Sequence, residues 1–294
     1  YRADWQKSSF GTTAHTAGMW YSLFRGGGNP AADTILGTGT NLAFQALTDA
    51  TAGATGIPHG GNVAGGYKVL LNAAAQTAAA TTAPCVLMLV DLLGFYPITT
   101  VTTTGAQALN NTVTLPRYTD GAGVQAFITP STAMGAGTPN LSIGYTNSGG
   151  TEGRATPAVL PIANATAPVT QIVYSGTGAG KYGPFMPLAP GDAGIRSVQS
   201  INLSATMTSG VLNLVLCKPL MTLPITTLGV TAERDLVNQF ASMPKVYDGA
   251  CAVGPVITLA SAVPNVRDVT IRLTGSMDRA RTIASGSGKG ICDV

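Results

Sequence analysis

Short apolar stretches recur at close spacing along the chain and predict strands. They cover residues 67–75, 85–93, 112–116, 124–129, 141–146, 171–174, 196–206, 211–217, 256–259 and 269–274. Each stretch is rich in β-branched or apolar residues and is bounded by Gly, Pro or Asn, as is typical of strands joined by turns. Within residues 197–203, polar positions alternate with apolar ones, so we expect one buried face and one wet face.

One segment has a helical pattern instead. Residues 232–240 follow Thr231, which can cap a helix, and Glu233 favours the positive end of the helix dipole. Leu236, Val237 and Phe240 then form a short apolar stripe. The sequence therefore predicts a single short helix among many strands.

The chain contains a weak internal repeat. Residues 86–100 resemble residues 211–227, and both segments end in Pro-Ile-Thr-Thr. Residues 115–123 resemble residues 243–251, and both contain an Asp-Gly pair that favours a turn. The two matches are collinear, at offsets of 125 to 128 residues, so we predict two tandem domains of similar fold.

These observations predict an all-β protein with two tandem sandwich domains of the jelly-roll or Greek-key kind. The first domain covers residues 60–175 and the second covers residues 176–294. Residues 1–59 form an extended, Gly-rich N-terminal arm with no helical or strand period. Its aromatics pack either into the chain's own sandwich or against a neighbouring subunit. The candidate interface anchors are Trp5, Phe10, Trp20, Tyr21 and Phe24.

Composition narrows the class of protein. Only 10% of the residues are charged and 45% are hydrophobic, which excludes intrinsic disorder. The 16 basic and 13 acidic residues are scattered, so we expect no specific nucleic-acid groove. The longest apolar stretch, residues 86–96, is about half a membrane span and contains Asp91, so we predict buried strands and no membrane partner. The chain as given begins at Tyr1 without a recognisable signal peptide.

The candidate chemical motifs do not fulfil their structural requirements. Residues 178–183 fit a G-x-G-x-x-G pattern, but three prolines in the next seven residues exclude the helix that a dinucleotide site needs. His15 and His59 are the only imidazoles, and no nucleophile motif accompanies them. The four cysteines, Cys85, Cys217, Cys251 and Cys292, are too far apart for a zinc motif. We therefore predict no catalytic residue, no cofactor and no metal site, and a protein that is not an enzyme.

The aromatic Gly/Thr-rich arm, residues 187–192 leading into the strand from Ile195, and residues 115–123 together resemble virion structural proteins of tailed bacteriophages. The resemblance is to capsid decoration, or cement, proteins and to minor head proteins. It implies an inert β module that assembles as a homo-oligomer, with a trimer favoured, on the major capsid protein or other virion proteins. It also implies location in the virion after synthesis in the bacterial host cytoplasm.

Two other functions stay open from the sequence. A tail, baseplate or host-receptor-binding protein of a phage would also be β-rich. A secreted carbohydrate-binding sandwich would need a cluster of exposed aromatics on one face, whereas the aromatics outside the arm are dispersed.

Overall fold

The protein is described from a computed structural model that covers residues 2–9, 20–57, 59–60, 63, 66–77, 83–157, 160–161, 171–172, 184–238, 243–259 and 269–279. Within these residues the regular structure is strand, apart from one 3₁₀ turn at Leu23–Arg25. The strands form several antiparallel sheets, which confirms the predicted all-β, sandwich-like fold.

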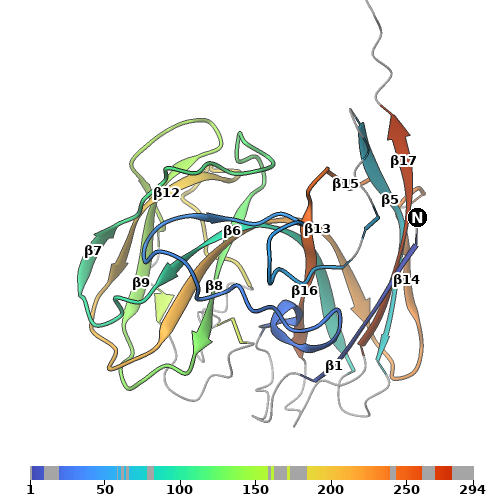
Figure 1. Ribbon diagram of the computed structural model, residues 1–294, viewed down its shortest axis with the longest axis horizontal. Helices are drawn as coiled ribbons and strands as arrows, with labels where there is room; N and C mark the ends of the chain where they lie inside the picture. The colour runs from blue at the N-terminus through green and yellow to red at the C-terminus, as the bar shows by residue number, and fades with distance from the viewer. Residues whose placement is uncertain are drawn as a thin grey trace, which may run out of the picture.

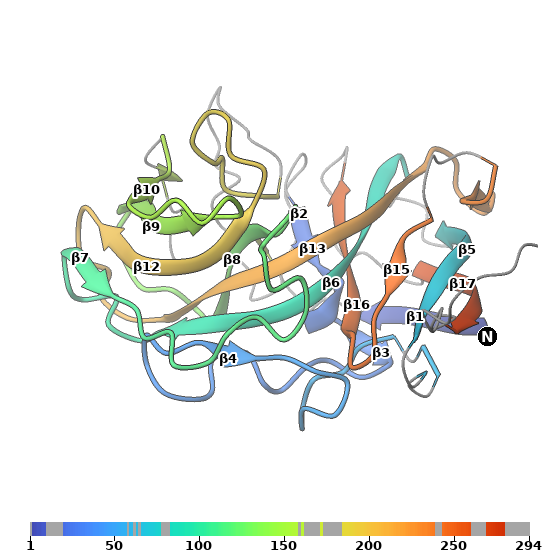
Figure 2. The same ribbon diagram turned by 90° about the horizontal axis from the view of Figure 1, so that it is seen from above.

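Two very long strands form the centre of the molecule. β6 (Cys85–Ile98) and β13 (Val211–Ile225) pair along almost their whole length. In Figure 1 they run through the middle of the structure, and Figure 2 shows them side by side across much of its width. The central sheet has the order β2-β16-β6-β13-β8, and β4 also pairs with β6. Its other strands are β2 (Trp20–Ser22), β4 (Gln45–Ala46), β8 (Gln125–Thr132) and β16 (Cys251–Leu259).

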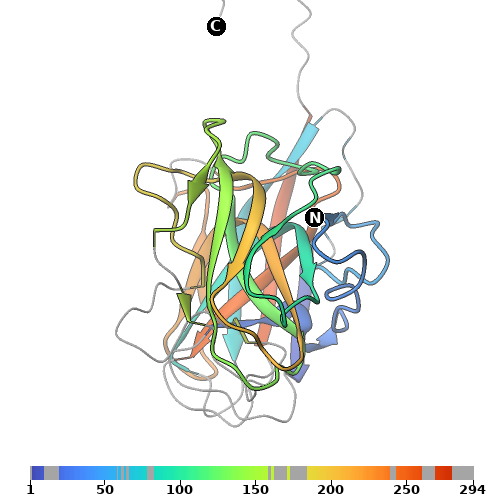
Figure 3. The ribbon, with the colours of Figure 1, turned by 90° about the vertical axis from the view of Figure 1, so that its left-hand side faces the viewer.

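Two outer sheets pack at opposite ends of these long strands. The first has the order β10-β9-β12-β7, with β11 beside β9, and Figure 3 shows β9 and β12 in front of the central sheet. The second has the order β14-β5-β17-β1-β3, with β15 beside β5. The strands of the first are β7 (Gly105–Ala108), β9 (Asn140–Asn147), β10 (Arg154–Ala155), β11 (Leu160–Pro161) and β12 (Ile195–Leu203). Those of the second are β1 (Arg2–Ser9), β3 (Gly27–Asn29), β5 (Gly66–Thr77), β14 (Ala232–Asp235), β15 (Lys245–Val246) and β17 (Val269–Arg279).

Each end of the molecule has its own hydrophobic core. The larger core lies with the first outer sheet and includes Phe95, Phe127 and Ile201. The smaller core lies with the second outer sheet and includes Leu70, Leu87 and Leu223. Because β6 and β13 contribute side chains to both cores, the two ends are joined by continuous backbone as well as by hydrogen bonds.

The two halves of the chain exchange their first strands. In the first outer sheet, β12 from the second half lies between β7 and β9 from the first half. In the second, β5 from the first half lies between β14 and β17 from the second half. The central sheet follows the same rule, since β8 pairs with β13 and β16 pairs with β6. Each half therefore completes the sheets of the other.

The registers of the two outer sheets agree over residues 199–203 and 71–75, whereas β12 has a further irregularity between Ile195 and Ser197 that β5 lacks. Leu203 of β12 lies opposite Gly105 and Leu141, and Ala75 of β5 lies opposite Ala232 and Ile271. Both exchanged strands also carry a bulge at the matching residue. The bulge of β12 is at Gln199, whose carbonyl accepts the Leu109 N–H at 2.8 Å, and that of β5 is at Leu71, whose carbonyl accepts the Leu236 N–H at 2.9 Å. The bulge in β12 explains how Val198, Ile201 and Leu203 all face the core, although their spacing departs from strict alternation.

Three predictions about organisation need correction. The division into separate sandwiches at 60–175 and 176–294 is wrong, because strands from both sides of residue 175 pair in every sheet. The described residues of the predicted arm, residues 1–59, are no free arm, since β1 pairs with β17 and β2 with β16. The predicted helix at 232–240 is strand β14 over its first four residues and turn at 236–238, because the backbone there pairs with β5; residues 239–242 lie outside the described part.

Candidate functional site

The five predicted anchors have different environments. Tyr21 is fully buried and Phe24 is 1% exposed, so both belong to the chain's own core and cannot anchor a neighbour. Trp20 is half-buried and packs against the larger core. Trp5 lies on β1, whose backbone pairs with β17, but the Trp5 side chain is outside the described part of the structure. Phe10 is outside it entirely.

Other residues singled out from the sequence have structural roles. Cys85 and Cys217 are buried free thiols. Gly121 and Gly249 of the two Asp-Gly pairs have positive φ angles, +76° and +67°, and form matching turns just before β8 and β16. His15, Cys292 and residues 178–183 lie outside the described part of the chain.

His59 is buried and has a fixed tautomer. Its Nδ1 lies 2.8 Å from the Lys68 ammonium, which can only donate, so Nδ1 accepts and Nε2–H donates to the Ala250 carbonyl at 2.8 Å. Burial lowers the pKa of His59, and the Lys68 charge lowers it further against the pull of Asp49. Both ring nitrogens are occupied, so His59 is a buried connector between the segment before β5 and the turn before β16.

A buried ion pair holds the segment that follows β7. The Arg117 guanidinium donates to both carboxylate oxygens of Asp91, at 2.7 and 2.9 Å. It also donates to the carbonyls of Leu47, Leu92 and Gly249 at 2.7–3.1 Å. Arg117 has its five N–H groups directed at five oxygens, which is the arrangement that makes a buried charge tolerable. It thereby draws residues 115–118 toward the central sheet.

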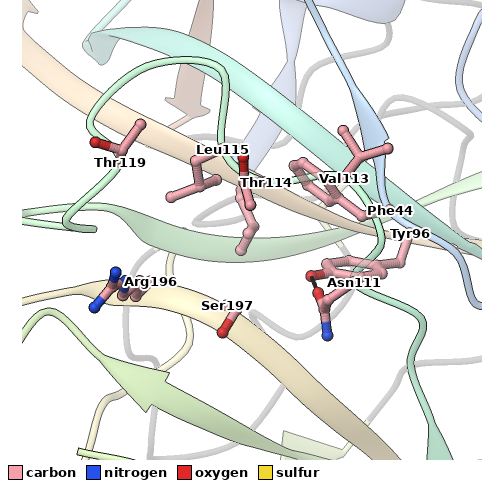
Figure 4. A pocket seen from close by; sticks show the side chains of 10 residues that line it. Phe44, Tyr96, Asn111, Val113, Thr114, Leu115, Thr119, Arg196 and Ser197 are labelled. Carbon is pink, nitrogen blue, oxygen red and sulfur yellow. Dashed lines mark hydrogen bonds between the residues drawn. The ribbon is translucent and has the colours of Figure 1, made fainter. Parts of the chain in front are cut away.

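An open cavity of about 270 Å³ lies between this segment and β12. Figure 4 shows Thr114, Leu115 and Thr119 on one side and Arg196 and Ser197 of β12 on the other. The remaining lining residues are Phe44, Tyr96, Asn111, Val113 and Leu216. The wall is mostly apolar, with hydroxyl groups and one guanidinium at the rim.

The polar groups at one end of the cavity are satisfied internally. The Tyr96 hydroxyl donates to Asn111 Oδ1 at 2.6 Å, and Asn111 Nδ2 donates to the Val198 carbonyl at 2.7 Å. The Val198 N–H donates to the Tyr96 hydroxyl at 3.4 Å, which completes a ring of three hydrogen bonds. Burial raises the pKa of Tyr96 well above its usual value, so this hydroxyl stays protonated. The ring orients Tyr96 and Asn111 but leaves no base beside a nucleophile.

The lining residues of this cavity offer both polar and apolar contacts to a bound molecule. The hydroxyl groups of Thr114, Thr119 and Ser197 can donate hydrogen bonds to a bound molecule or accept them from it. The Arg196 guanidinium can bind a negatively charged group. Phe44, Leu115 and Leu216 offer apolar contact. The sequence analysis did not predict this cavity because one of its walls is the exchanged strand β12. Two signals were nevertheless visible in the sequence. Asp91 lies in an apolar stretch, and Arg117 occupies the position that Lys245 has in the second copy of the repeat.

The described residues contain no group of three or more His, Cys, Asp or Glu side chains placed to hold a metal ion. A helix with the length and apolarity to cross a membrane is likewise not found among the residues that the structure describes. Comparison of the chain with protein-family models, with curated proteins and with solved structures found no match.

Proposed function

We propose that this chain is a non-enzymatic structural protein of a bacteriophage particle that decorates or cements the capsid shell. The observation that carries the proposal is the interlocked architecture: every sheet contains strands from both halves, and two long strands pair along almost their whole length. Separating either end requires breaking β-ladders as well as a core. A protein built in this way resists being pulled apart at its two ends. This property suits a protein that joins neighbouring subunits of a shell.

The proposed partners are further copies of this chain, with a trimer favoured, and the major capsid protein or other virion proteins. The resemblance of the arm and of residues 115–123 and 187–192 to phage structural proteins supports this choice. A tail, baseplate or host-binding role in the same particle is the second candidate. A carbohydrate-binding function has less support, because the exposed large apolar side chains among the described residues are all aliphatic: Val113, Leu228, Val230 and Val237.

The proposal is tested on purified phage particles from the source of the protein. Mass spectrometry of gradient-purified particles should detect the chain at a fixed ratio to the major capsid protein. Immunogold labelling with an antibody against the recombinant chain should mark the head. Label on the tail alone would favour the second candidate, and a chain missing from washed particles would refute a virion role.

A further inference from the structure

The open cavity between residues 113–119 and β12 has two different ends. Figure 4 shows Tyr96 and Asn111 at one end and Arg196 at the other. At the first end the Tyr96 hydroxyl accepts the Val198 N–H, and Asn111 Nδ2 donates to the Val198 carbonyl. Both backbone groups of Val198 are therefore engaged, and this end offers a ligand an aromatic ring and no free strand edge.

The wall of the cavity is mainly apolar. Phe44, Leu115 and Leu216 line it and are almost fully buried, whereas Val113, which also lines it, is 46% exposed. An apolar body in the cavity would therefore cover one of the few exposed large aliphatic side chains of the described residues. An apolar cavity of about 150 Å³ is large enough to bind benzene. The volume here, about 270 Å³, has room for one aromatic ring and a short chain that carries a headgroup.

The opposite end of the cavity carries a positive charge without a partner. Arg196 is exposed and forms no ion pair with any described residue. Its Nη1 lies beside Gly150, which has no side chain to cover the guanidinium. The Asp120 carboxylate is already engaged, since it accepts the Ala122 N–H at 3.0 Å and favours the protonated form of Lys218. A bound anion would supply the partner that the Arg196 charge lacks.

The two walls of the cavity are held in place without a ligand. Arg117, paired with Asp91, fixes residues 115–118 on one side. The turn at Gly121 packs directly on the start of β12, so closely that a Cβ at this glycine would lie 2.4 Å from the Ile195 carbonyl oxygen. This contact leaves no room for an added strand there. A site that is formed in advance loses little conformational entropy on binding, which favours a small and rigid ligand.

We propose that this cavity binds a small aromatic carboxylate, with its ring against Phe44 and Leu115 and its carboxylate on the Arg196 guanidinium. A guanidinium can donate two parallel hydrogen bonds to a planar carboxylate, so this pairing fixes the orientation of the ligand as well as its charge. The occupant is a free small molecule. The backbone groups of Val198 are already bonded, so a peptide would find no partners for its own N–H and C=O groups there.

The probe is 3-phenylpropionate, in which a short aliphatic chain joins one ring to a carboxylate. Isothermal titration and saturation-transfer NMR with the full chain should show saturable binding, with a dissociation constant of about 1 mM or below. The neutral amide of the same acid should bind about tenfold more weakly, because it loses the charge-assisted pair. The oppositely charged 3-phenylpropylammonium should not bind. With Arg196→Gln the acid should lose its advantage over the amide, and equal binding of acid and amide to the natural chain would overturn the proposal.

A matched pair of variants localises the site. Thr114→Trp narrows the cavity and should weaken binding of the acid at least tenfold, whereas Thr112→Trp, on the same exposed segment but outside the cavity, should not. Circular dichroism melts check that both variants fold like the natural chain. A second cavity variant, Thr119→Trp, replaces Thr114→Trp if that one does not fold. Equal binding by the cavity and control variants, or no binding by the natural chain, overturns the proposal.

The end of a protein chain is the alternative occupant. Acetyl-glycyl-phenylalanine carries the same ring and carboxylate on a peptide backbone. If it binds at least tenfold more tightly than 3-phenylpropionate and Thr114→Trp abolishes this binding, the occupant is the C-terminal residue of a protein and the assignment to a free small molecule is wrong. Any weaker binding of the peptide supports the small molecule. None of these measurements uses phage particles, so they succeed or fail independently of the proposed virion function.

Discussion

The Asp91–Arg117 pair should dominate the stability of the central sheet. Arg117→Met removes five hydrogen bonds and leaves the Asp91 carboxylate buried without its partner. Removing one member of a buried pair typically costs about 3–5 kcal/mol. Since a folded protein is typically stable by about 5–15 kcal/mol, this change removes a large share of the total.

The assay is equilibrium urea unfolding followed by circular dichroism and tryptophan fluorescence. We expect the midpoint of Arg117→Met to fall steeply with little change in the slope. The control Arg196→Met removes an exposed arginine that forms no ion pair with the described residues, so its effect should stay within about 0.5 kcal/mol. In the double variant Asp91→Leu with Arg117→Met no buried charge remains, and it should be at least about 2 kcal/mol more stable than Arg117→Met alone.

Two results would refute this reasoning. A loss below about 1 kcal/mol in Arg117→Met would mean that water or a neighbouring group solvates the Asp91 carboxylate. Strictly additive effects in the double variant would mean that the two side chains stabilise the fold separately and are not coupled. Either result would also remove the explanation given for the position of residues 115–118.

Four further outcomes are expected. A protease site inserted within residues 176–181 should leave both fragments together in gel filtration after cleavage, because β-ladders join them; separation would contradict the strand exchange. Deletion of residues 1–28 should abolish the native circular dichroism signal, since it removes three core side chains worth about 1.5–3 kcal/mol each. In a variant that retains only Cys85 and Cys217, a thiol reagent should label neither in the native state and both after unfolding, because burial raises their pKa, that of Cys85 to about 12. The free energy of unfolding should fall as the pH drops from about 7 through 6.5. The reason is that His59 of the unfolded chain binds a proton in this range, whereas buried His59 of the folded chain takes it up only at lower pH. His59→Gln should flatten this dependence on pH, and an unchanged slope would show that His59 is not its source.

Local sequence patterns predicted most of the long strands but not their partners. The strand predicted at residues 112–116 is wrong, since these residues are irregular, and β1, β7 and β14 were not predicted. The apolar stretch from residue 85 is a strand in which every residue is buried or partly buried, and a near-continuous apolar run is typical of a strand covered on both faces. The similarity of residues 86–100 to 211–227 was also visible. A repeat indicates that two segments share a structure. It does not indicate whether a strand pairs within its own half or joins a sheet of the other half. The exchange of β5 and β12 therefore depends on tertiary structure, and no local sequence pattern predicts it.

The incorrect helix at 232–240 has a similar cause. The helical spacing of Phe240 from Leu236 and Val237, and an N-terminal Glu233, are weak preferences of a few tenths of a kcal/mol each. Pairing of residues 232–235 with β5 satisfies four residues of backbone at a sheet edge, and tertiary pairing outweighs such preferences. In the structure Leu236 is buried and Val237 is 53% exposed, so the expected stripe does not exist.

The differences between the two halves carry more functional information than their similarities. The bulges at Gln199 and Leu71, the registers beside them and the Asp-Gly turns match because both halves must present the same edges to one another. The segment after each central long strand is free of that constraint, and there the halves diverge. In one half it forms β15, covers β5 and leaves Lys68 fully hydrogen-bonded; in the other Arg117 withdraws it and leaves Arg196 beside an open cavity. The fold tolerates this divergence because the long ladder between β6 and β13, which joins the two halves, lies outside this segment.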